Sequence, residues 1–339
     1  MDAPRLHRLL PGVAAGLPYL PLGSGPTPLR ELTGMPAGAA PVWLKDDGRY
    51  GQGGWGGNKV RKLEWILPDA DRSGARTIVT FGAIGTNHGL ATAVYGEAHG
   101  QRVVLVVVDQ PMNERVAARL ERLRRTASEV HVTHTKARTI AALPFLLGRL
   151  ALSDRHLPYV LPVGGSSAVG AFGYVEGALE LAQQVRAGQM PEPSHVVVAL
   201  GSGGTVSGLA LGLRLAGLKT RVVGVLVNDN MNLEPAVLAR LAGRSARLLE
   251  KRGAELPAAP PSPEDITVER EFLGPGYGHV TPEAERALKL AREHEGLELE
   301  PVYTGKALAG LLALNERGAF GEGPVVFLNT HGPRDEGGS

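Results

Sequence analysis

The chain has 339 residues, more than one small core can hold, so we expect two domains. Charges of both signs are interspersed and sum to a formal net charge of only +2, which favours a small-molecule partner over a nucleic acid. Cysteine is absent, so we expect no disulfides and assign no metal ligand. No apolar run is long enough for a membrane span, and the segment from Met1 to Leu6 lacks the apolar core of a signal peptide. We therefore expect a cytoplasmic protein.

Short runs of β-branched and apolar residues alternate with amphipathic stretches along most of the chain. Several runs are apolar throughout, which is typical of strands that helices cover on both faces. The expected strands cover residues 77–81, 102–108, 129–132, 159–161, 195–200, 221–227 and 325–328. The expected helices cover residues 59–71, 88–99, 114–124, 170–187, 206–216, 282–295 and 305–317. This alternation predicts an α/β protein with mainly parallel sheets.

Two stretches are expected to be loops. They cover residues 18–41, which are rich in glycine and proline, and residues 256–263, which contain four prolines. Proline and glycine interrupt regular structure, and the second stretch is expected to lie on the surface.

A lysine directly follows two glycines and an asparagine at the start of the first long expected helix. The segment reads Gly56-Gly57-Asn58-Lys59. The partial positive charge at a helix N-terminus disfavours an ammonium ion, so Lys59 is expected to lose its proton readily and to act as an amine nucleophile. An ordinary solvated lysine in the first turn is the alternative interpretation.

A glycine-rich turn, Gly201 to Thr205, follows the expected strand at residues 195–200 and leads into an apolar helix. In such a turn, backbone N–H groups at the positive end of a helix form a cradle for a phosphate group. The turn lacks the Gly-Lys-Ser/Thr of an ATP-binding loop, and Val206 stands where a dinucleotide-binding turn has its third glycine. A tight turn that needs glycine for packing alone is the alternative.

An amine nucleophile and a phosphate cradle that suits neither ATP nor NAD together point to pyridoxal phosphate as the cofactor. Further short motifs follow one another in a fixed order between about Pro26 and Gly332. Together with the lysine segment and the glycine-rich turn, the motifs are, in chain order, Thr27-Pro28-Leu29, Leu44-Lys45-Asp46-Asp47, residues 56–64, Thr86-Asn87-His88, Pro162-Val163-Gly164-Gly165-Ser166, residues 201–209, Gly276-Tyr277-Gly278, residues 301–306 and Thr330. In this order the sequence resembles the D-cysteine desulfhydrase and 1-aminocyclopropane-1-carboxylate deaminase family, within the tryptophan-synthase-β-like enzymes.

The resemblance implies a two-domain, tryptophan-synthase-β-like α/β fold (fold type II), with mainly parallel twisted sheets and helices on both faces. It implies a large cofactor-binding domain formed by residues 1–52 and 166–339. A small domain, residues 53–165, would carry the turn for the substrate carboxylate. The cofactor would lie between the domains, beyond the carboxyl ends of the strands. A homodimer is expected because dimers are common in this family.

The resemblance also implies roles for individual residues. Lys59 would form the Schiff base and later move the Cα proton, and Thr86, Tyr277 and Tyr303 would be the other catalytic residues. The cofactor would be held by Asn58, Lys59, Lys62, Gly201, Ser202, Gly203, Gly204, Thr205, Tyr303, Thr304 and Thr330. The small amino-acid substrate would be bound by Thr86, Asn87, His88, Ser166 and Tyr277.

The neighbour of the pyridine nitrogen separates the two branches of the family. In the deaminase branch an acidic residue follows the stacking tyrosine, whereas here Thr304 follows Tyr303. Thr304 or Thr330 would leave the nitrogen neutral. This favours β-elimination from a D-cysteine-like amino acid, with release of keto acid, ammonia and sulfide, over opening of a cyclopropane ring. Ring opening, β-replacement and racemisation remain alternatives.

The sequence departs from the family pattern where the substrate should bind. The usual Gln-Ser-Asn-His turn reads Gly-Thr-Asn-His at residues 85–88, Leu90 stands where arginine is frequent, and Trp55 is a bulky addition. His331 replaces a glycine near the expected ring position. With an ordinary pKa near 6.5 it could move a proton, although a loop histidine without a catalytic role is the more common case.

Two hypotheses come from other classes. An NAD-dependent oxidoreductase would use residues 201–208, with Asp229 on the ribose, but Val206 argues against it. The second hypothesis is a non-catalytic member of the same family that binds a cofactor or ligand for regulation. The presence of Lys59 argues against this hypothesis.

Overall fold

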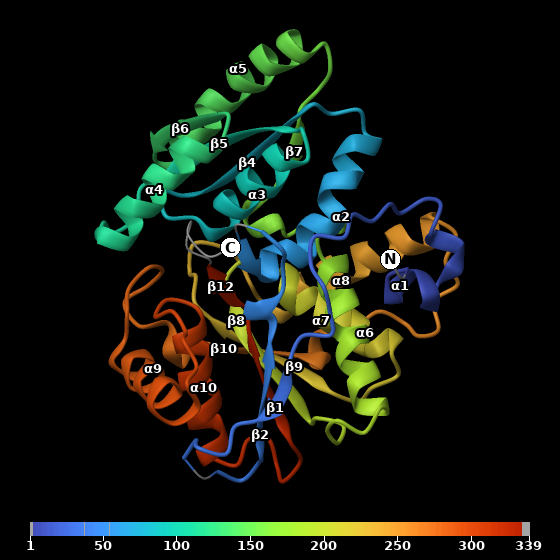
Figure 1. The fold of residues 1–339 in the computed structure, drawn as a ribbon, viewed down its shortest axis with the longest axis vertical. Helices are drawn as coiled ribbons and strands as arrows, with labels where there is room; N and C mark the ends of the chain where they lie inside the picture. The colour runs from blue at the N-terminus through green and yellow to red at the C-terminus, as the bar shows by residue number, and fades with distance from the viewer. Residues whose placement is uncertain (1–2, 37, 54, 334–339) are drawn as a thin grey trace.

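The computed structural model describes residues 3–36, 38–53 and 55–333, and its strands form two main sheets in separate lobes (Figure 1). The larger sheet has the strand order β1-β2-β11-β8-β9-β10, and the smaller sheet has the order β6-β5-β4-β7. Within these two sheets the described pairs are parallel, except that β1 runs antiparallel to β2. The prediction of an α/β protein with mainly parallel sheets is confirmed.

The strands are short, as is usual for parallel sheets covered by helices. In the larger sheet they are β1 (Leu29–Glu31), β2 (Val42–Asp46), β8 (His195–Leu200), β9 (Arg221–Leu226), β10 (Ile266–Glu269) and β11 (Val325–Asn329). In the smaller sheet they are β4 (Thr77–Ala83), β5 (Arg102–Val108), β6 (Glu129–His134) and β7 (Tyr159–Leu161). A separate antiparallel pair joins β3 (Trp55–Gly57) to β12 (His331–Pro333).

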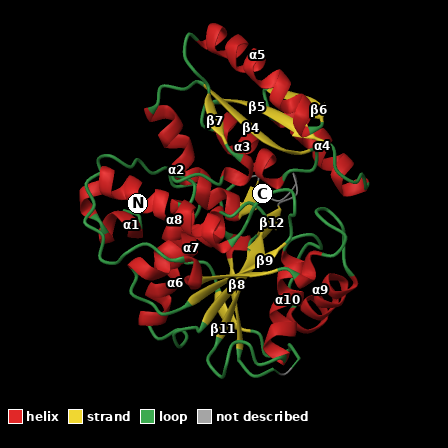
Figure 2. Cartoon of the chain, turned by 180° about the vertical axis from the view of Figure 1, so that it is seen from behind, coloured by secondary structure: helices red, strands yellow, loops and turns green. Residues whose placement is uncertain are grey.

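Helices cover both main sheets. They are α1 (Arg5–Leu9), α2 (Asn58–Arg72), α3 (Asn87–Ala98), α4 (Glu114–Thr126), α5 (Lys136–Asp154), α6 (Phe172–Arg186), α7 (Gly204–Leu215), α8 (Pro235–Lys251), α9 (Pro282–Glu295) and α10 (Thr304–Glu316). Seen from behind in Figure 2, α6, α7 and α8 lie on one side of the larger sheet, and α9 and α10 lie on the other. No helix in the described part of the chain is both long and apolar enough to span a membrane.

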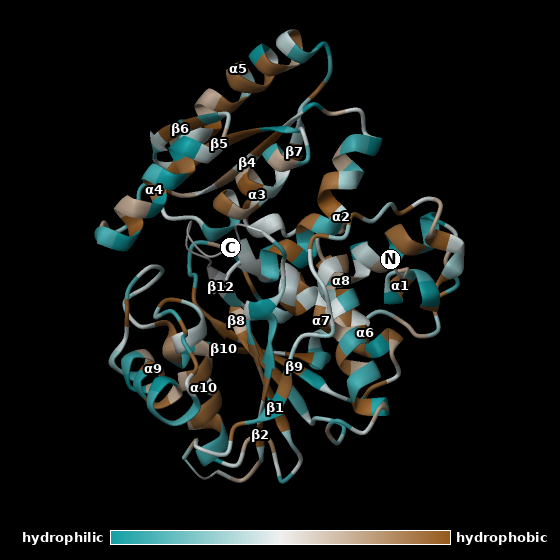
Figure 3. Cartoon of the chain, in the orientation of Figure 1, coloured by the Kyte–Doolittle hydropathy of each residue, from teal (hydrophilic) through white to brown (hydrophobic). Residues whose placement is uncertain are grey.

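The alternation of side chains along each strand divides the core into layers. In β5, Val103 and Leu105 pack in the cluster that holds residues of α2 and α3, whereas Val104 packs with Leu146 and Leu150 of α5. The larger sheet is divided in the same way between α7 and α10. Figure 3 shows many hydrophobic residues on these central strands and mainly hydrophilic residues on the outer helices α4 and α9. Apolar residues on both faces are what buried parallel strands require.

Each expected strand and helix occurs within a few residues of its expected bounds. The helices and strands that the sequence pattern missed are α1, α5, α8, β1, β2, β3, β10 and β12. Pro144 lies inside α5, and a proline in a helix interior removes a backbone hydrogen bond and disfavours a helix prediction. The expected loop at residues 18–41 is wrong in part, because it contains β1. The proline-rich stretch at residues 256–263 joins α8 to β10.

A buried ion cluster joins α2 to the larger sheet and to α6. Arg61 of α2 donates to Asp47, which follows β2, from Nε at 2.8 Å and from Nη2 at 2.9 Å. The same Nη2 donates to Glu180 of α6 at 2.9 Å, and Lys45 Nζ lies 2.5 Å from that carboxylate. These side chains are at most 3% exposed. The cluster therefore fixes the position and rotation of α2.

The charge of Glu180 depends on its cationic partners. Burial alone would raise the pKa of Glu180, but Arg61 and Lys45 outweigh burial and hold the pKa below its ordinary value of 4.5. A carboxyl group whose pKa is depressed by folding adds stability above the unfolded pKa, and this contribution is lost as the pH falls through the folded pKa. The cluster should therefore weaken in acid, below about pH 4.5.

We predict that Arg61→Met destabilises the protein by about 3–5 kcal/mol, because two buried carboxylates lose a partner. Urea unfolding followed by circular dichroism measures this change. Arg317→Met is the matched control, since Arg317 also binds a carboxylate through two nitrogens, but at an exposed site with Glu271. Equal stability of the Arg61 variant and the wild type would contradict the importance of the cluster.

Candidate functional site

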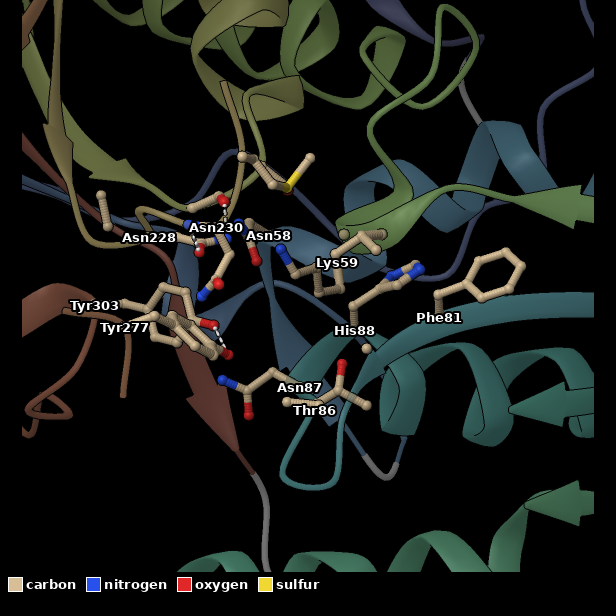
Figure 4. A pocket seen from close by; sticks show the side chains of 18 of the residues that line it. Asn58, Lys59, Phe81, Thr86, Asn87, His88, Asn228, Asn230, Tyr277 and Tyr303 are labelled. Carbon is tan, nitrogen blue, oxygen red and sulfur yellow. Dashed lines mark hydrogen bonds between the residues drawn. The ribbon is translucent and has the colours of Figure 1, made fainter. Parts of the chain in front are cut away.

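A cavity of about 420 Å³ lies between the two lobes (Figure 4). Its walls come from the carboxyl ends of β4 and β5 in one lobe and of β8 and β9 in the other, with the β3–β12 pair and the start of α2 between them. The predicted site residues that line it are Asn58, Lys59, Thr86, Asn87, His88, Gly201, Ser202, Gly203, Thr205, Tyr277, Tyr303, Thr304 and Thr330. Lys62, Ser166 and Gly204 lie just behind this lining.

Lys59 is placed in the cavity by the two glycines of β3. A Cβ atom on Gly57, whose φ is 88°, would lie 2.4 Å from the Thr330 carbonyl oxygen, and a Cβ atom on Gly56 would lie 2.5 Å from the Gly332 oxygen. Only glycine lets β3 and β12 approach so closely. Helix α2 begins immediately afterwards, with Lys59 in its first turn.

The Lys59 amine loses its proton more readily than an ordinary lysine. Burial lowers the pKa of Lys59 to about 8. The expected direction is confirmed, and the physical cause is loss of water contact, which disfavours the charged form. Figure 4 shows Lys59 between Asn58 and His88, and it shares the cavity with the turn at residues 201–205.

The glycine-rich turn forms a cradle at the N-terminus of α7. Gly203 caps this helix with a φ of 90°, and a Cβ atom there would lie 2.7 Å from a methyl group of Leu238. The first amides of a helix have no partner within the helix, so those of Thr205 and Val206 are left for an anion. The geometry fits the phosphate group that the sequence predicts.

Polar side chains surround the cradle. Ser166 Oγ accepts a hydrogen bond from the Gly204 amide at 3.0 Å and donates to Ser202 Oγ at 2.9 Å. Asn58 donates to the Thr205 hydroxyl at 3.3 Å. The structure therefore places Ser166, which the sequence predicts as a substrate contact, beside the cradle.

Lys62 also reaches the cradle from behind. Its amine donates to the Gly164 carbonyl oxygen at 3.1 Å and lies 3.0 Å from the position that a Cβ atom on Gly204 would take. Burial, together with the charge of Lys59, holds the pKa of Lys62 well below its ordinary value. A phosphate group beside it would favour the charged form.

A second helix N-terminus faces the cavity from the smaller lobe. Thr86 caps α3, and its hydroxyl accepts a hydrogen bond from the Gly89 amide at 3.1 Å. The preceding amides, of Asn87 and His88, have no partner within the helix and lie at its positive end. This turn can bind a carboxylate. Leu90 is fully buried in the core behind the turn, so this departure from the family does not face the cavity.

The side chains of Asn87 and His88 point in different directions. His88 Nε2 hydrogen-bonds to the Thr80 hydroxyl at 3.0 Å, and burial, aided by Lys59 and Lys62, holds its pKa well below the ordinary value. It is therefore neutral. The Asn87 amide oxygen accepts a hydrogen bond from Arg119 of α4.

Tyr277 and Tyr303 form a pair on the far side of the cavity. Their hydroxyl groups lie 2.8 Å apart and their ring planes are inclined at 78°. Burial raises the pKa of both phenols, so both keep their protons at neutral pH. A Cβ atom on Gly201 would lie 3.0 Å from the Tyr303 ring, so the glycine leaves room for the tyrosine.

The two threonines expected beside the pyridine nitrogen differ in their partners. The Thr304 hydroxyl accepts from the Glu300 amide at 3.0 Å and donates to the Glu300 carbonyl oxygen at 3.3 Å. Glu300 itself caps α10, because its carboxylate accepts hydrogen bonds from the amides of residues 302–304. For the Thr330 hydroxyl, the described part of the chain offers no hydrogen bond, so this group is free to meet a ligand.

His331 lines the cavity but is not suited to proton transfer at neutral pH. Burial, followed by the positive charges of Arg119 and Arg115, lowers its pKa to about 3. The pKa near 6.5 assumed from the sequence is therefore wrong, and the imidazole stays neutral.

Sequence reasoning missed several residues that line the cavity. They are Phe81, Asp109, Lys136, Asn228, Asn230, Met231 and Glu300. Asn228 donates to the Gly201 carbonyl oxygen at 2.8 Å and so supports the cradle. Its position just after a buried strand was the signal that could have found it, because carboxyl ends of parallel strands meet at ligand sites.

Comparison with known proteins agrees with this site. Residues 20–331 match the family described as pyridoxal-phosphate dependent enzyme. A D-cysteine desulfhydrase of Klebsiella pneumoniae is 37% identical over 322 residues, which cover 93% of this chain and 94% of that protein. A D-cysteine desulfhydrase of Salmonella paratyphi A is 35% identical over 325 residues, with the same shares covered.

Solved structures show the same fold. The crystal structure of an ACC deaminase homologue has a TM-score of 0.79 and 29% sequence identity, and the match covers 97% of this chain and 95% of that one. A hydrogen sulfide-producing enzyme from Fusobacterium nucleatum has a TM-score of 0.62 over 91% of this chain and 96% of its own; at 17% identity it shows likeness of fold alone. The resemblance, the fold and the cofactor expected from the sequence are confirmed, and the chain belongs to the family of pyridoxal-phosphate dependent enzymes.

Proposed function

We propose that the protein is a lyase that removes the β-substituent of a D-cysteine-like amino acid and releases a keto acid, ammonia and sulfide. One observation carries the proposal: the Lys59 amine, whose pKa is lowered, shares one cavity with a phosphate cradle and with the start of α3. The similarity to D-cysteine desulfhydrases over nearly the whole chain supports this substrate class.

One set of residues in the site would bind the cofactor, and another set would bind the substrate. Pyridoxal phosphate, when bound, withdraws electrons from the Cα atom of the substrate. The cradle at residues 201–205 would hold its phosphate, with Lys62 and Ser166 behind it, and Lys59 would carry it and take the Cα proton. Asn58 would lie beside the ring, and Tyr303 would cover one ring face.

The substrate side would use the smaller lobe. The amides of Asn87 and His88 would bind the carboxylate, and the Thr86 hydroxyl still has its proton to donate. Tyr277, held by Tyr303, would lie near the leaving group. Thr330 is a better neighbour for the pyridine nitrogen than Thr304, because the Thr304 hydroxyl is already bonded at both ends to Glu300. A neutral nitrogen favours elimination.

We propose that the lobes correspond to a large domain of residues 1–52 and 166–339 and a small domain of residues 53–165. The expected homodimer and the cytoplasmic location also remain proposals. Large apolar side chains exposed on and just after α5, namely Ile140, Phe145, Leu152 and Leu157, support association with a second copy. Light scattering of the purified protein tests this association.

A second candidate function is ring opening of 1-aminocyclopropane-1-carboxylate. The TM-score of 0.79 with an ACC deaminase homologue favours it. Both activities would release ammonia and a keto acid, but only elimination from D-cysteine would also release sulfide. Assays of both substrates, with D- and L-isomers of cysteine, distinguish them.

We predict that wild-type protein releases sulfide from D-cysteine and that Lys59→Ala lowers the rate by at least about 100-fold, because the base at Cα is lost. The variant should also lose the visible absorbance of the covalently bound cofactor. Lys289→Ala, at an exposed position on α9, is the control and should match the wild type in both measurements. A Lys59→Ala variant with wild-type absorbance would overturn the assignment of this lysine.

The lowered pKa of Lys59 gives a prediction that needs no cofactor. With a pKa of about 8, roughly a tenth of the amine is unprotonated at pH 7, against less than about a thousandth for an ordinary lysine with a pKa near 10.5. In the apoprotein, labelling of Lys59 by an amine-specific reagent should rise with pH and level off above about pH 9. Peptide mass spectrometry measures this profile. Labelling of exposed Lys289 should still rise at pH 10, and identical profiles for the two lysines would refute the shift.

A further inference from the structure

Arg119 contacts the proposed carboxylate turn from behind. It projects from α4, and its Nη1 donates to the Asn87 amide oxygen and, at 3.4 Å, to the Gly85 carbonyl oxygen. Gly85 lies just before α3, and Asn87 is its first residue. Arg119 is outside the cavity lining, whereas Asn87 is part of it. Any effect of Arg119 on a bound amino acid would therefore pass through the turn.

The contact determines which end of the Asn87 amide faces the cavity. A side-chain amide has an oxygen that accepts and an NH₂ group that donates, and a guanidinium group only donates. The oxygen must therefore face Arg119, and the NH₂ group points the other way. Figure 4 shows the Asn87 nitrogen on the side of the Tyr277 and Tyr303 hydroxyls. Rotation of the amide by half a turn would place N–H groups against the guanidinium.

Arg119 is itself held in place. Its guanidinium carbon lies 5.5 Å from the centre of the Trp55 ring, within the range of a cation–π contact. Burial lowers the pKa of Arg119, and the negative charge of Glu300 opposes this shift. A guanidinium remains charged even so, because its ordinary pKa exceeds 12. The bulky Trp55, a departure from the family, thus supports the arginine.

We infer that Arg119 is a positioning residue that fixes the Asn87 side chain as a hydrogen-bond donor for the carboxylate of the amino-acid substrate. The inference rests on the proposed function, in which the turn at residues 86–88 binds that carboxylate. Arg119 does not touch the substrate.

The test compares Arg119→Met, which removes the donor, with Arg119→Lys, which keeps a charged donor. D-alanine is the binding probe, since it has a carboxylate and an amine but no leaving group, and its dissociation constant is read from the change in the cofactor's visible absorbance. We expect Arg119→Met to raise this constant, and the KM for D-cysteine, by about tenfold, with kcat changed by less than about twofold. Arg119→Lys should restore much of the affinity. Arg124→Met, on the same helix, is the control.

Two further variants separate positioning from a general structural effect. If Arg119 acts through Asn87, the double variant Asn87→Ala/Arg119→Met should bind D-alanine as weakly as Asn87→Ala alone. Asn87→Asp keeps the bond to Arg119 but presents an oxygen to the substrate, so it should bind more weakly than Asn87→Ala. The thermal unfolding midpoint of each apoprotein shows whether it is folded.

The outcomes are distinct. Additive losses in the double variant, or wild-type affinity of Arg119→Met, would overturn the inference. If D-alanine binds but D-cysteine yields no sulfide, the proposed elimination fails, while the dissociation constants still decide the role of Arg119. If the wild type responds to no amino acid, the proposed function and the inference fail together.

Discussion

The ion cluster of Arg61, Asp47 and Glu180 determines where Lys59 lies. Arg61 follows Lys59 by two residues on α2, so the bonds that hold Arg61 to the end of β2 and to α6 also hold the first turn of the helix. Burial of these charges is costly without good geometry, and both carboxylates have several partners. Charge interactions within the core thus fix the position of the Lys59 amine, which would have to reach the cofactor.

The chemistry of the site comes from three helix N-termini that meet at one cavity. Helix α2 supplies the lysine, and in the proposed function the first amides of α7 would bind a phosphate and those of α3 a carboxylate. Each follows an extended segment whose end lies at the cavity, and each points its positive end inward. A cofactor and an amino-acid substrate together present two anionic groups, a phosphate and a carboxylate, and the two sets of amides could bind them on opposite sides of the Lys59 amine. The arrangement suits a reaction in which charge develops at the atom between them.

Local patterns made the helix start at Lys59 and the glycine-rich turn at residues 201–205 predictable. The glycines before Lys59, the turn at residues 201–205 and the apolar strands have short-range causes that can be read directly. Arg119 acts across a contact with a residue 32 positions away in the chain, so no local sequence pattern predicts its role. The pKa expected for His331 was wrong because long-range contacts determine it: burial and two arginines of α4 lower it.

Two positions at which the sequence departs from the family pattern, Gly85 and Trp55, lie on the proposed substrate side of the site. A Cβ atom on Gly85 would lie 2.7 Å from the Gln110 amide nitrogen, so the space where relatives carry a glutamine in the turn is here taken by a glutamine from the loop after β5. Trp55 in turn packs against Arg119, which bonds to the same turn. These two departures lie in or against the turn that precedes α3, and neither lies in the cradle at residues 201–205. Because a turn held by long-range contacts can shift without disturbing the cofactor, selectivity among amino acids can change while the common chemistry is retained.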